Sequence, residues 1–182
     1  MTQAPHDPEE EAFLREARRL WRASWPAGVP AEPTYAAGEI ALSSYLTHWA
    51  AVVPDTTAIG FSGRDITYRE LDRLSDAFAR YLEDQGVQAG DRIAAYLPTC
   101  PQFHVVFFGV LKRGAVMVPV NPMLREHELE FVLQDSGARL IVAQDSLVDL
   151  ALTVMPRIGL ETVVVTCIAD MLPADDADIP VP

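Results

Sequence analysis

Cysteine, lysine and histidine are residue types whose side chains can attack a substrate or transfer a proton, and each of them is rare in this sequence. Cys100 stands directly before Pro101, at the predicted start of a helix, where backbone N–H groups can lower the pKa of a thiol. The sequence assigns no base to Cys100, so a capping or packing role is favoured. Cys167 is distant in sequence and adjoins a predicted strand. This cysteine usage, without metal-ligand spacing, is typical of a reducing cytosol and not of a disulfide scaffold.

Lys112 is the only lysine of the chain. It falls in the last turn of a predicted helix, where a cation offsets the negative end of the helix dipole, and we favour that role over Schiff-base chemistry. The four histidines are each interpreted as structural, because none is paired with a catalytic partner. They are His6 in the N-terminal tail, His48 beside Trp49, His104 on an apolar helix and His127 in a charged run.

Phosphate-binding motifs are absent from the sequence. Neither GxGxxG nor GxxxxGK[ST] occurs, and the GxSxG nucleophile elbow is missing too. Residues 60–63 (GFSG) lack the spacing that cradles a phosphate and predict a hairpin turn. The sequence therefore assigns no catalytic, cofactor-binding or metal-binding residue.

Residues 86–122 are the clearest structural unit of the chain and predict a strand, a helix and a second strand. Residues 92–96 (RIAAY) form an apolar run between turn residues, as in a strand that is covered on both faces. Pro101 fits the first helical position, with Thr99 or Cys100 as the cap, and Gly114 fits the end. The inward side of this largely buried helix is expected to carry Phe103, Val106, Phe107, Val110 and Leu111. Residues 115–120 are the next strand, which makes the pair parallel.

A second helix is predicted over residues 68–85. Thr67 and Glu70 have the spacing of a capping box, and Gly86 fits the end of the helix. The buried stripe is expected to contain Leu71, Leu74, Phe78 and Leu82.

The other predicted elements follow from the same patterns. They are a helix at 9–24 with Phe13, Ala17, Leu20 and Trp21 on its apolar side, a proline-rich connector at 25–35, a helix capped by Ser43 or Ser44, a hairpin of strands 58–61 and 64–67, a helix at 126–136 ended by Gly137, a strand at 139–143, a helix capped by Ser146, and a strand at 162–166.

Alternating strands and helices predict an α/β fold with a mostly parallel sheet and helices on both faces. We expect three regions: residues 1–41 as tail, docking helix and connector, residues 42–169 as the α/β subdomain, and residues 170–182 as an acidic, proline-rich linker or frayed end.

Charge and hydropathy exclude several classes of partner. The formal net charge of −12 argues against nucleic acid and against an anionic membrane surface. No apolar run is long enough to span a bilayer, and the N-terminus is acidic where a signal peptide would be basic. A cytoplasmic location is expected.

Several segments together resemble the adenylate-forming (AMP-binding) enzymes, the superfamily that includes acyl-CoA synthetases, luciferases and the adenylation domains of peptide synthetases. Residues 66–71 (ITYREL) are similar to an early helix start of that superfamily, and residues 90–98 (GDRIAAYLP) to its first parallel strand. Residues 111–122 (LKRGAVMVPVNP) resemble the following helix end and strand. The form of residues 121–138 is most similar to bacterial long-chain fatty-acid–CoA ligases.

The resemblance implies an acid–thiol ligase. In the complete enzyme, ATP and a fatty acid give an acyl-adenylate and pyrophosphate, and the thiol of CoA then displaces AMP, with Mg²⁺ neutralising phosphate charge. The fold implied is an incomplete N-terminal subdomain of that enzyme. The remainder of the synthetase and the fatty acid are the implied partners, and a homodimer through the N-terminal segment is expected from long-chain relatives.

The 182 residues lack the superfamily's Ser/Thr/Gly-rich loop ending in Pro-Lys-Gly and its C-terminal domain with the adenylation lysine, and Lys112 matches neither. We therefore expect no acyl-adenylate formation by this chain alone, and no tight binding of ATP, Mg²⁺ or CoA. The alternative is a stand-alone, non-catalytic binding or scaffold domain derived from the same family.

Overall fold

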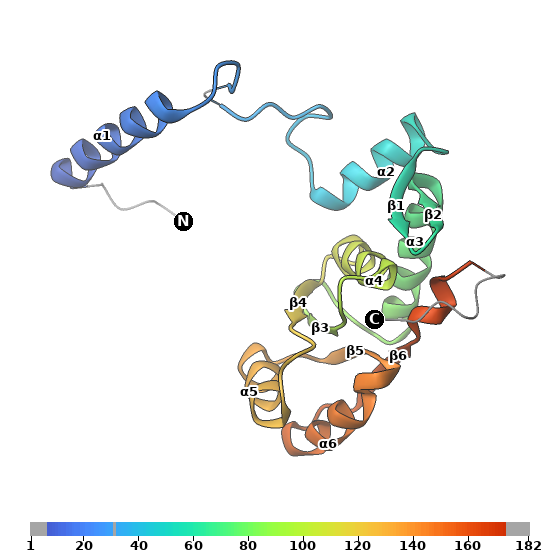
Figure 1. Cartoon of the computed structure of the whole chain (residues 1–182). Helices are drawn as coiled ribbons and strands as arrows, with labels where there is room; N and C mark the ends of the chain where they lie inside the picture. The colour runs from blue at the N-terminus through green and yellow to red at the C-terminus, as the bar shows by residue number, and fades with distance from the viewer. Residues whose placement is uncertain (1–6, 31, 174–182) are drawn as a thin grey trace. The chain divides into compact units, whose positions relative to one another are not determined.

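The computed structural model describes residues 7–30 and 32–173 (Figure 1). The chain divides into two compact units, Met1–Glu39 and Ile40–Pro182. The sequence predicted region boundaries after residue 41 and after residue 169. The tail at residues 1–6 and most of the predicted C-terminal linker, residues 174–182, lie outside the described residues.

The first unit is built on helix α1 (Pro8–Ser24), which confirms the helix predicted there. Asp7 accepts a hydrogen bond from the N–H of Glu9 at 3.1 Å, and Pro8 occupies the first turn, where its missing N–H is no loss. None of the residues of α1 is buried. Phe13 and Trp21, on the predicted apolar side, are 71% and 62% exposed.

The second unit contains a four-stranded sheet in the order β4-β3-β5-β6. All three strand pairs are parallel, which confirms the predicted sheet. The strands are β3 (Arg92–Tyr96), β4 (Val116–Val120), β5 (Leu140–Gln144) and β6 (Thr162–Thr166). β4 is an edge strand, and its Pro119 lies opposite Ala95 of β3.

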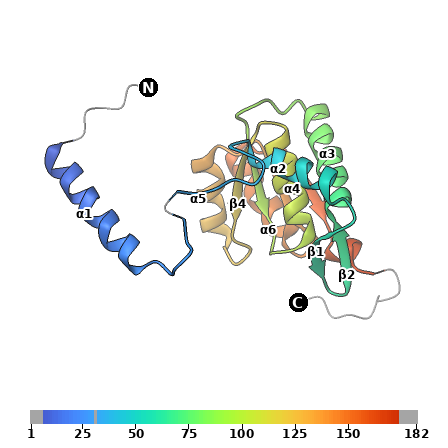
Figure 2. The ribbon, with the colours of Figure 1, turned by 90° about the horizontal axis from the view of Figure 1, so that it is seen from above.

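Helices cover both faces of this sheet, as predicted. They are α3 (Tyr68–Asp84) and α4 (Pro101–Lys112) on one face, and α5 (Glu126–Ser136) and α6 (Val148–Ile158) on the other. Figure 1 shows the first pair above the strands and the second pair below them, and Figure 2 gives the view from above. Ile93 and Ala95 pack toward α3 and α4, whereas Ala94 and Tyr96 pack toward α5 and α6. Side chains alternate along a strand, so β3 is covered on both faces and is apolar at Ile93, Ala94 and Ala95.

A smaller layer lies beside α3 and α4. Helix α2 (Leu42–Val52) and the antiparallel hairpin β1 (Thr57–Phe61) and β2 (Arg64–Thr67) build a third core around Leu46, Ile66 and Leu71. Ser62 and Gly63 turn the hairpin with φ of 46° and 82°, the left-handed pair that a two-residue hairpin loop requires. The predicted hairpin is confirmed.

Local signals fix most helix ends, with three corrections. Thr67 Oγ1 accepts from the N–H of Glu70 at 3.2 Å, as predicted, but the Glu70 carboxylate pairs with Arg64 at 2.7 Å. The predicted caps Ser43 or Ser44 and Ser146 are wrong. α2 starts from Ala41 without a side-chain cap, and Ser146 lies inside a 3₁₀ turn (Asp145–Leu147) that precedes α6.

The described chain ends beside the third core. A 3₁₀ turn (Ile168–Met171) follows β6, with Ile168 buried and Met171 packed against the core around Leu46. Asp170 and Met171, which the sequence assigned to the linker, therefore belong to an ordered turn. No helix among the described residues is long and apolar enough to span a membrane.

Candidate functional site

The carboxyl edge of the parallel sheet is the place where this fold can form a site. β3 leads into α4 on one face, and its neighbour β5 leads into α6 on the other. The two connections diverge, and ligands of open α/β sheets bind at such a divergence, outside the carboxyl ends of the strands. The candidate site is the set of polar side chains found there.

Cys100, Asp145 and Cys167 all follow strand ends at this edge. Cys100 is the N-cap residue of α4, and Asp145 and Cys167 come directly after β5 and β6. Gln102, in the first turn of α4, donates through Nε2 to the carbonyl oxygen of Cys167 at 2.7 Å. The Cys167 thiol donates to the Asp145 carboxylate. The fold therefore places Cys167 beside Gln102, which lies two residues after Cys100, and both cysteines are free thiols.

Neither thiol is prepared to act as a nucleophile. Burial raises the pKa of Cys100, which is 3% exposed, and outweighs the opposing effect of the N–H groups of Phe103 and Gln102. The hydrogen bond to Asp145 raises the pKa of Cys167, because a carboxylate disfavours the thiolate beside it. Both side chains are therefore protonated at neutral pH. This agrees with the capping or packing role favoured for Cys100, which is the buried N-cap residue of α4.

The histidines add no base to the site. His104 lies one turn into α4 and its Nδ1 is 3.1 Å from the carbonyl oxygen of Cys100, so that nitrogen carries the proton it donates. His48 makes an edge-to-face contact with Trp49, with ring centroids 5.1 Å apart, and His127 is exposed. His6 lies outside the described residues.

Lys112 has a role that the sequence interpretation missed. Its Nζ donates to Asp72 Oδ1 at 2.6 Å, to Asp76 Oδ1 at 2.7 Å and to the carbonyl oxygen of Asp72 at 3.0 Å. An ammonium group has three N–H donors, and all three are used to tie α4 to α3. Dipole compensation is therefore only part of the role of Lys112. Its side chain is 11% exposed, and its amine is held by acceptors on α3.

Gln102 is the polar residue of the site that sequence reasoning overlooked. It is 4% exposed, and its buried Oε1 has no hydrogen-bond partner among the described residues. The sequence signal that could have found it is a glutamine one residue after Pro101, in a helix predicted to be largely buried. The described residues include no group of three or more side chains placed to hold a metal ion.

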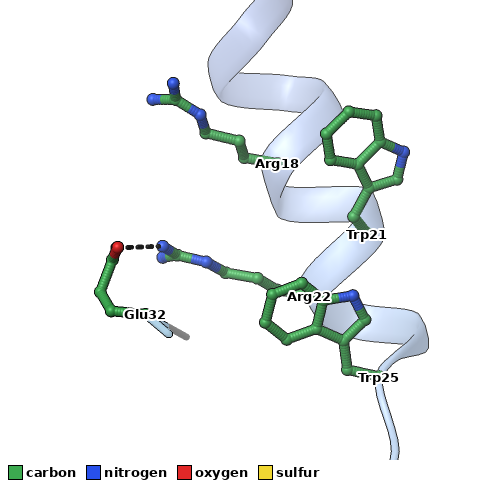
Figure 3. A pocket seen from close by; sticks show the side chains of 5 residues that line it. All are labelled: Arg18, Trp21, Arg22, Trp25 and Glu32. Carbon is green, nitrogen blue, oxygen red and sulfur yellow. Dashed lines mark ion pairs between the residues drawn. The ribbon is translucent and has the colours of Figure 1, made fainter. Parts of the chain in front are cut away.

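The first unit has a separate hollow of about 330 Å³ (Figure 3). Arg18, Trp21, Arg22, Trp25 and Glu32 line it, and the two arginines extend to the same side of α1. Arg22 pairs with Glu32 at 3.6 Å, but their side chains are 54% and 85% exposed. An exposed pair of this kind contributes at most about 1 kcal/mol, so the hollow has no built polar contact for a ligand.

The fold and the order of its strands define the class of protein: an open α/β domain with a parallel sheet. A family model described as AMP-binding enzyme matches residues 46–180. A long-chain-fatty-acid–CoA ligase from Bacillus subtilis is 36% identical over 160 residues, which are 87% of this chain and 28% of the relative.

Solved structures give the same result. The N-terminal domain of FACL13 from Mycobacterium tuberculosis is similar with a TM-score of 0.65 and 27% identity, over 77% of this chain and 38% of that one. A benzoate CoA ligase from Burkholderia xenovorans has a TM-score of 0.66 over 78% of this chain and 31% of that one. Its identity of 24% makes this a likeness of fold alone.

The chain belongs to the AMP-binding enzyme family and corresponds to the N-terminal part of an acyl-CoA ligase. It spans about 28% of the length of the curated relatives that it matches. The resemblance drawn from the residues is confirmed, and so is the α/β fold that it implied.

Proposed function

We propose that this chain is the N-terminal part of a fatty-acid–CoA ligase, which in its complete form converts a fatty acid, CoA and ATP to acyl-CoA, AMP and pyrophosphate. The match of residues 46–180 to the family, together with 36% identity to a long-chain-fatty-acid–CoA ligase, supports this proposal. A cytoplasmic location is part of it, since fatty-acid activation consumes ATP and CoA.

The described residues do not fit ATP with Mg²⁺. Such a site needs N–H groups or cations around the phosphates and carboxylates that are free to coordinate the ion. Asp72 and Asp76 lie together on α3, but both are engaged by Lys112. Lys112 in turn has no N–H left for a phosphate. We therefore propose that the isolated chain is a framework that binds none of the cofactors tightly and does not form acyl-adenylate.

ATP–pyrophosphate exchange tests this part of the proposal. The purified chain is incubated with ATP, Mg²⁺, labelled pyrophosphate and fatty acids of several chain lengths, beside a complete long-chain ligase as the positive control. We expect exchange by the complete enzyme and only background exchange by the chain. Fatty-acid-dependent exchange above background by the chain would contradict the proposal. Comparison with a Lys112→Met variant would then show whether the only lysine of the chain takes part in the reaction.

The reading frame of the source gene tests the assignment to a larger ligase. We expect it to continue past the codon for Pro182 into a Ser/Thr/Gly-rich segment that ends in Pro-Lys-Gly. A stop codon at that point would overturn the assignment and support the stand-alone, non-catalytic domain instead.

A further inference from the structure

Helix α4 has an apolar side for which the described chain supplies no core partner. All residues of α4 are buried or half-buried. Val106 and Val110 pack toward the sheet, and Val105 and Phe108 pack toward the third core. Phe107 and Leu111, which the sequence predicted to face inward, belong to none of the three described core clusters. A helix that is apolar around its whole circumference is normally buried on every side.

The outer face of α4 consists of His104, Phe107 and Leu111, which are spaced i, i+3 and i+7 and so share one side of the helix. Phe107 stacks with Phe103 at a centroid distance of 6.5 Å and meets the ring of Phe108 edge-on at 5.2 Å. These contacts hold the Phe107 ring in place before any neighbour arrives. The outer face is therefore a rigid apolar surface.

A hollow of about 280 Å³ adjoins the outer face, because His104 belongs to both and Phe108, whose ring meets Phe107, lines the hollow. Its other walls come from α2, β1 and α3 and are mainly apolar or aromatic, including Leu42, Trp49, Ile59 and Tyr68. Among the residues that the structure describes, no aspartate, glutamate, lysine or arginine lines it. The hollow can receive apolar side chains from a partner that lies across α4.

The path of the chain indicates which partner this is. Gln102 binds the carbonyl oxygen of Cys167, Met171 packs in the third core with Phe108, and Pro173 lies beside Gly63 at the hairpin turn. The described chain therefore passes the N-terminal end of α4 at Cys167 and ends at the hairpin turn, so a continuing chain starts in the layer that packs beside this helix. Most of the length of the relatives lies outside the matched part, which covers 28% of them.

We propose that the outer face of α4 and the hollow beside it form the docking surface for the part of the ligase that follows this chain. The inference rests on the proposed function, since it requires that the ligase continues. The partner surface that fits the outer face and the hollow is apolar, because apolar side chains make up most of the first and line most of the second.

Cysteine labelling compares the 182-residue chain with the full protein encoded by its gene. Leu111→Cys places a thiol on the outer face, and Gln134→Cys places a matched thiol on the exposed polar side of α5. Maleimide labelling of each position is followed by mass spectrometry of the peptides. We expect both thiols to react in the chain, and Leu111→Cys alone to react about tenfold or more slowly in the full protein, as for a site that reacts only on local opening.

The outcomes separate the two proposals. A reading frame that stops after Pro182 overturns the proposed function and this inference with it. A continuing reading frame with equal labelling of Leu111→Cys in both proteins overturns the docking surface and leaves the proposed function standing. Protection in the 182-residue chain that increases with its concentration assigns the surface to a second copy and also overturns the inference.

Discussion

The thiol of Cys167 shows how one charged neighbour sets reactivity at the carboxyl edge. Asp145 accepts its proton in a hydrogen bond, and this is the largest cause of the raised pKa. Asp145→Asn keeps the shape of the side chain but removes the negative charge that opposes the thiolate.

We expect Asp145→Asn to lower the pKa of Cys167 and to speed its alkylation severalfold at pH 8. Peptide-level measurement of the labelling rate checks this, with Cys100 of the same molecule as the control, because its raised pKa comes first from burial. An unchanged Cys167 rate would show that Asp145 does not hold the thiol.

Thr67 caps α3, and the cap predicts a defined loss of stability. Thr67→Ala removes the oxygen that accepts from the N–H of Glu70, which costs about 1 kcal/mol of unfolding free energy. Urea unfolding checks this value, and Thr67→Ser, which keeps the oxygen, is the control. Equal losses in the two variants would mean that the methyl group, and not the cap, stabilises the helix.

Asp91 links acid stability to the amino end of the sheet. Its carboxylate accepts from the N–H of Gln88 at 2.9 Å and from Arg139 at 2.7 Å, and these bonds, the backbone one first, lower its pKa. A lowered pKa stabilises the folded state above the unfolded pKa of about 3.9, and this contribution is lost as the pH falls through the folded pKa.

We therefore expect wild type to be more stable than Asp91→Asn at pH 7, and the difference to shrink as the pH is lowered below about 4. Urea midpoints of both proteins across that range measure it. A difference that is independent of pH would assign the effect of the substitution to shape and not to charge.

Interactions between residues close in sequence could be predicted from the sequence, whereas side-chain pairs between distant elements could not. The Thr67 cap needs only its own helix, so the sequence predicted it. The ion pairs of Lys112 involve Asp72 and Asp76, some forty positions earlier in the chain. The dipole interpretation considered only the helix that carries Lys112, so it did not include these partners. Cys100 and Cys167 lie at the same edge of the sheet because both follow parallel strands, a rule that could have placed them at that edge before the structure was known.

At the scale of elements, α3 and α4 approach each other closely at Gly109. A Cβ atom there would lie 2.8 Å from Cδ1 of Phe78 and 3.0 Å from the carbonyl oxygen of Ser75, and the backbone oxygen cannot rotate away. Alanine is the better helix former by about 1 kcal/mol, so propensity and packing oppose each other at this position.

We expect packing to prevail, with Gly109→Ala destabilising the protein by about 1 to 3 kcal/mol. Thermal or urea unfolding measures it. Gly60→Ala is the control, because its Cβ would be 3.6 Å from Asp65 Oδ1, an ordinary contact. A more stable Gly109→Ala protein would mean that the two helices can move apart at little cost.

The sequence predicted the positions of the helices and strands better than it predicted the residues that cap the helices. Strand β3 and helix α5 have the expected bounds because glycine and proline flank them. The serine caps failed because α2 starts one residue before Ser43, and because a 3₁₀ turn takes up Ser146. Serine propensity favours both a cap and a turn, so it cannot choose between them.

For the whole molecule, the three core clusters lie within residues 40–182, whereas α1 has no buried residue. Deleting residues 1–39 should therefore change the unfolding midpoint of the remainder by less than about 3 °C. Differential scanning calorimetry of both proteins checks this. A larger drop would show that the first unit packs on the second.

The same deletion tests the homodimer that we propose for the N-terminal segment. Exposed Phe13, Leu20 and Trp21 on α1 offer an apolar surface for a second copy. Sedimentation velocity should show self-association of the full chain and none after the deletion. Equal self-association in both would exclude this segment as the contact.

Pro119 makes the two edges of the sheet differ in their ability to pair with a further strand. Proline has no N–H to offer, so the free side of the edge strand β4 is a poor template for a further strand, whereas β6 at the opposite edge (Thr162–Thr166) keeps all its amides. A sheet blocked at one border and open at the other cannot polymerise edge to edge in both directions. Edge-to-edge association of this chain is therefore expected at β6 rather than at β4, and association through β6 alone would stop at pairs.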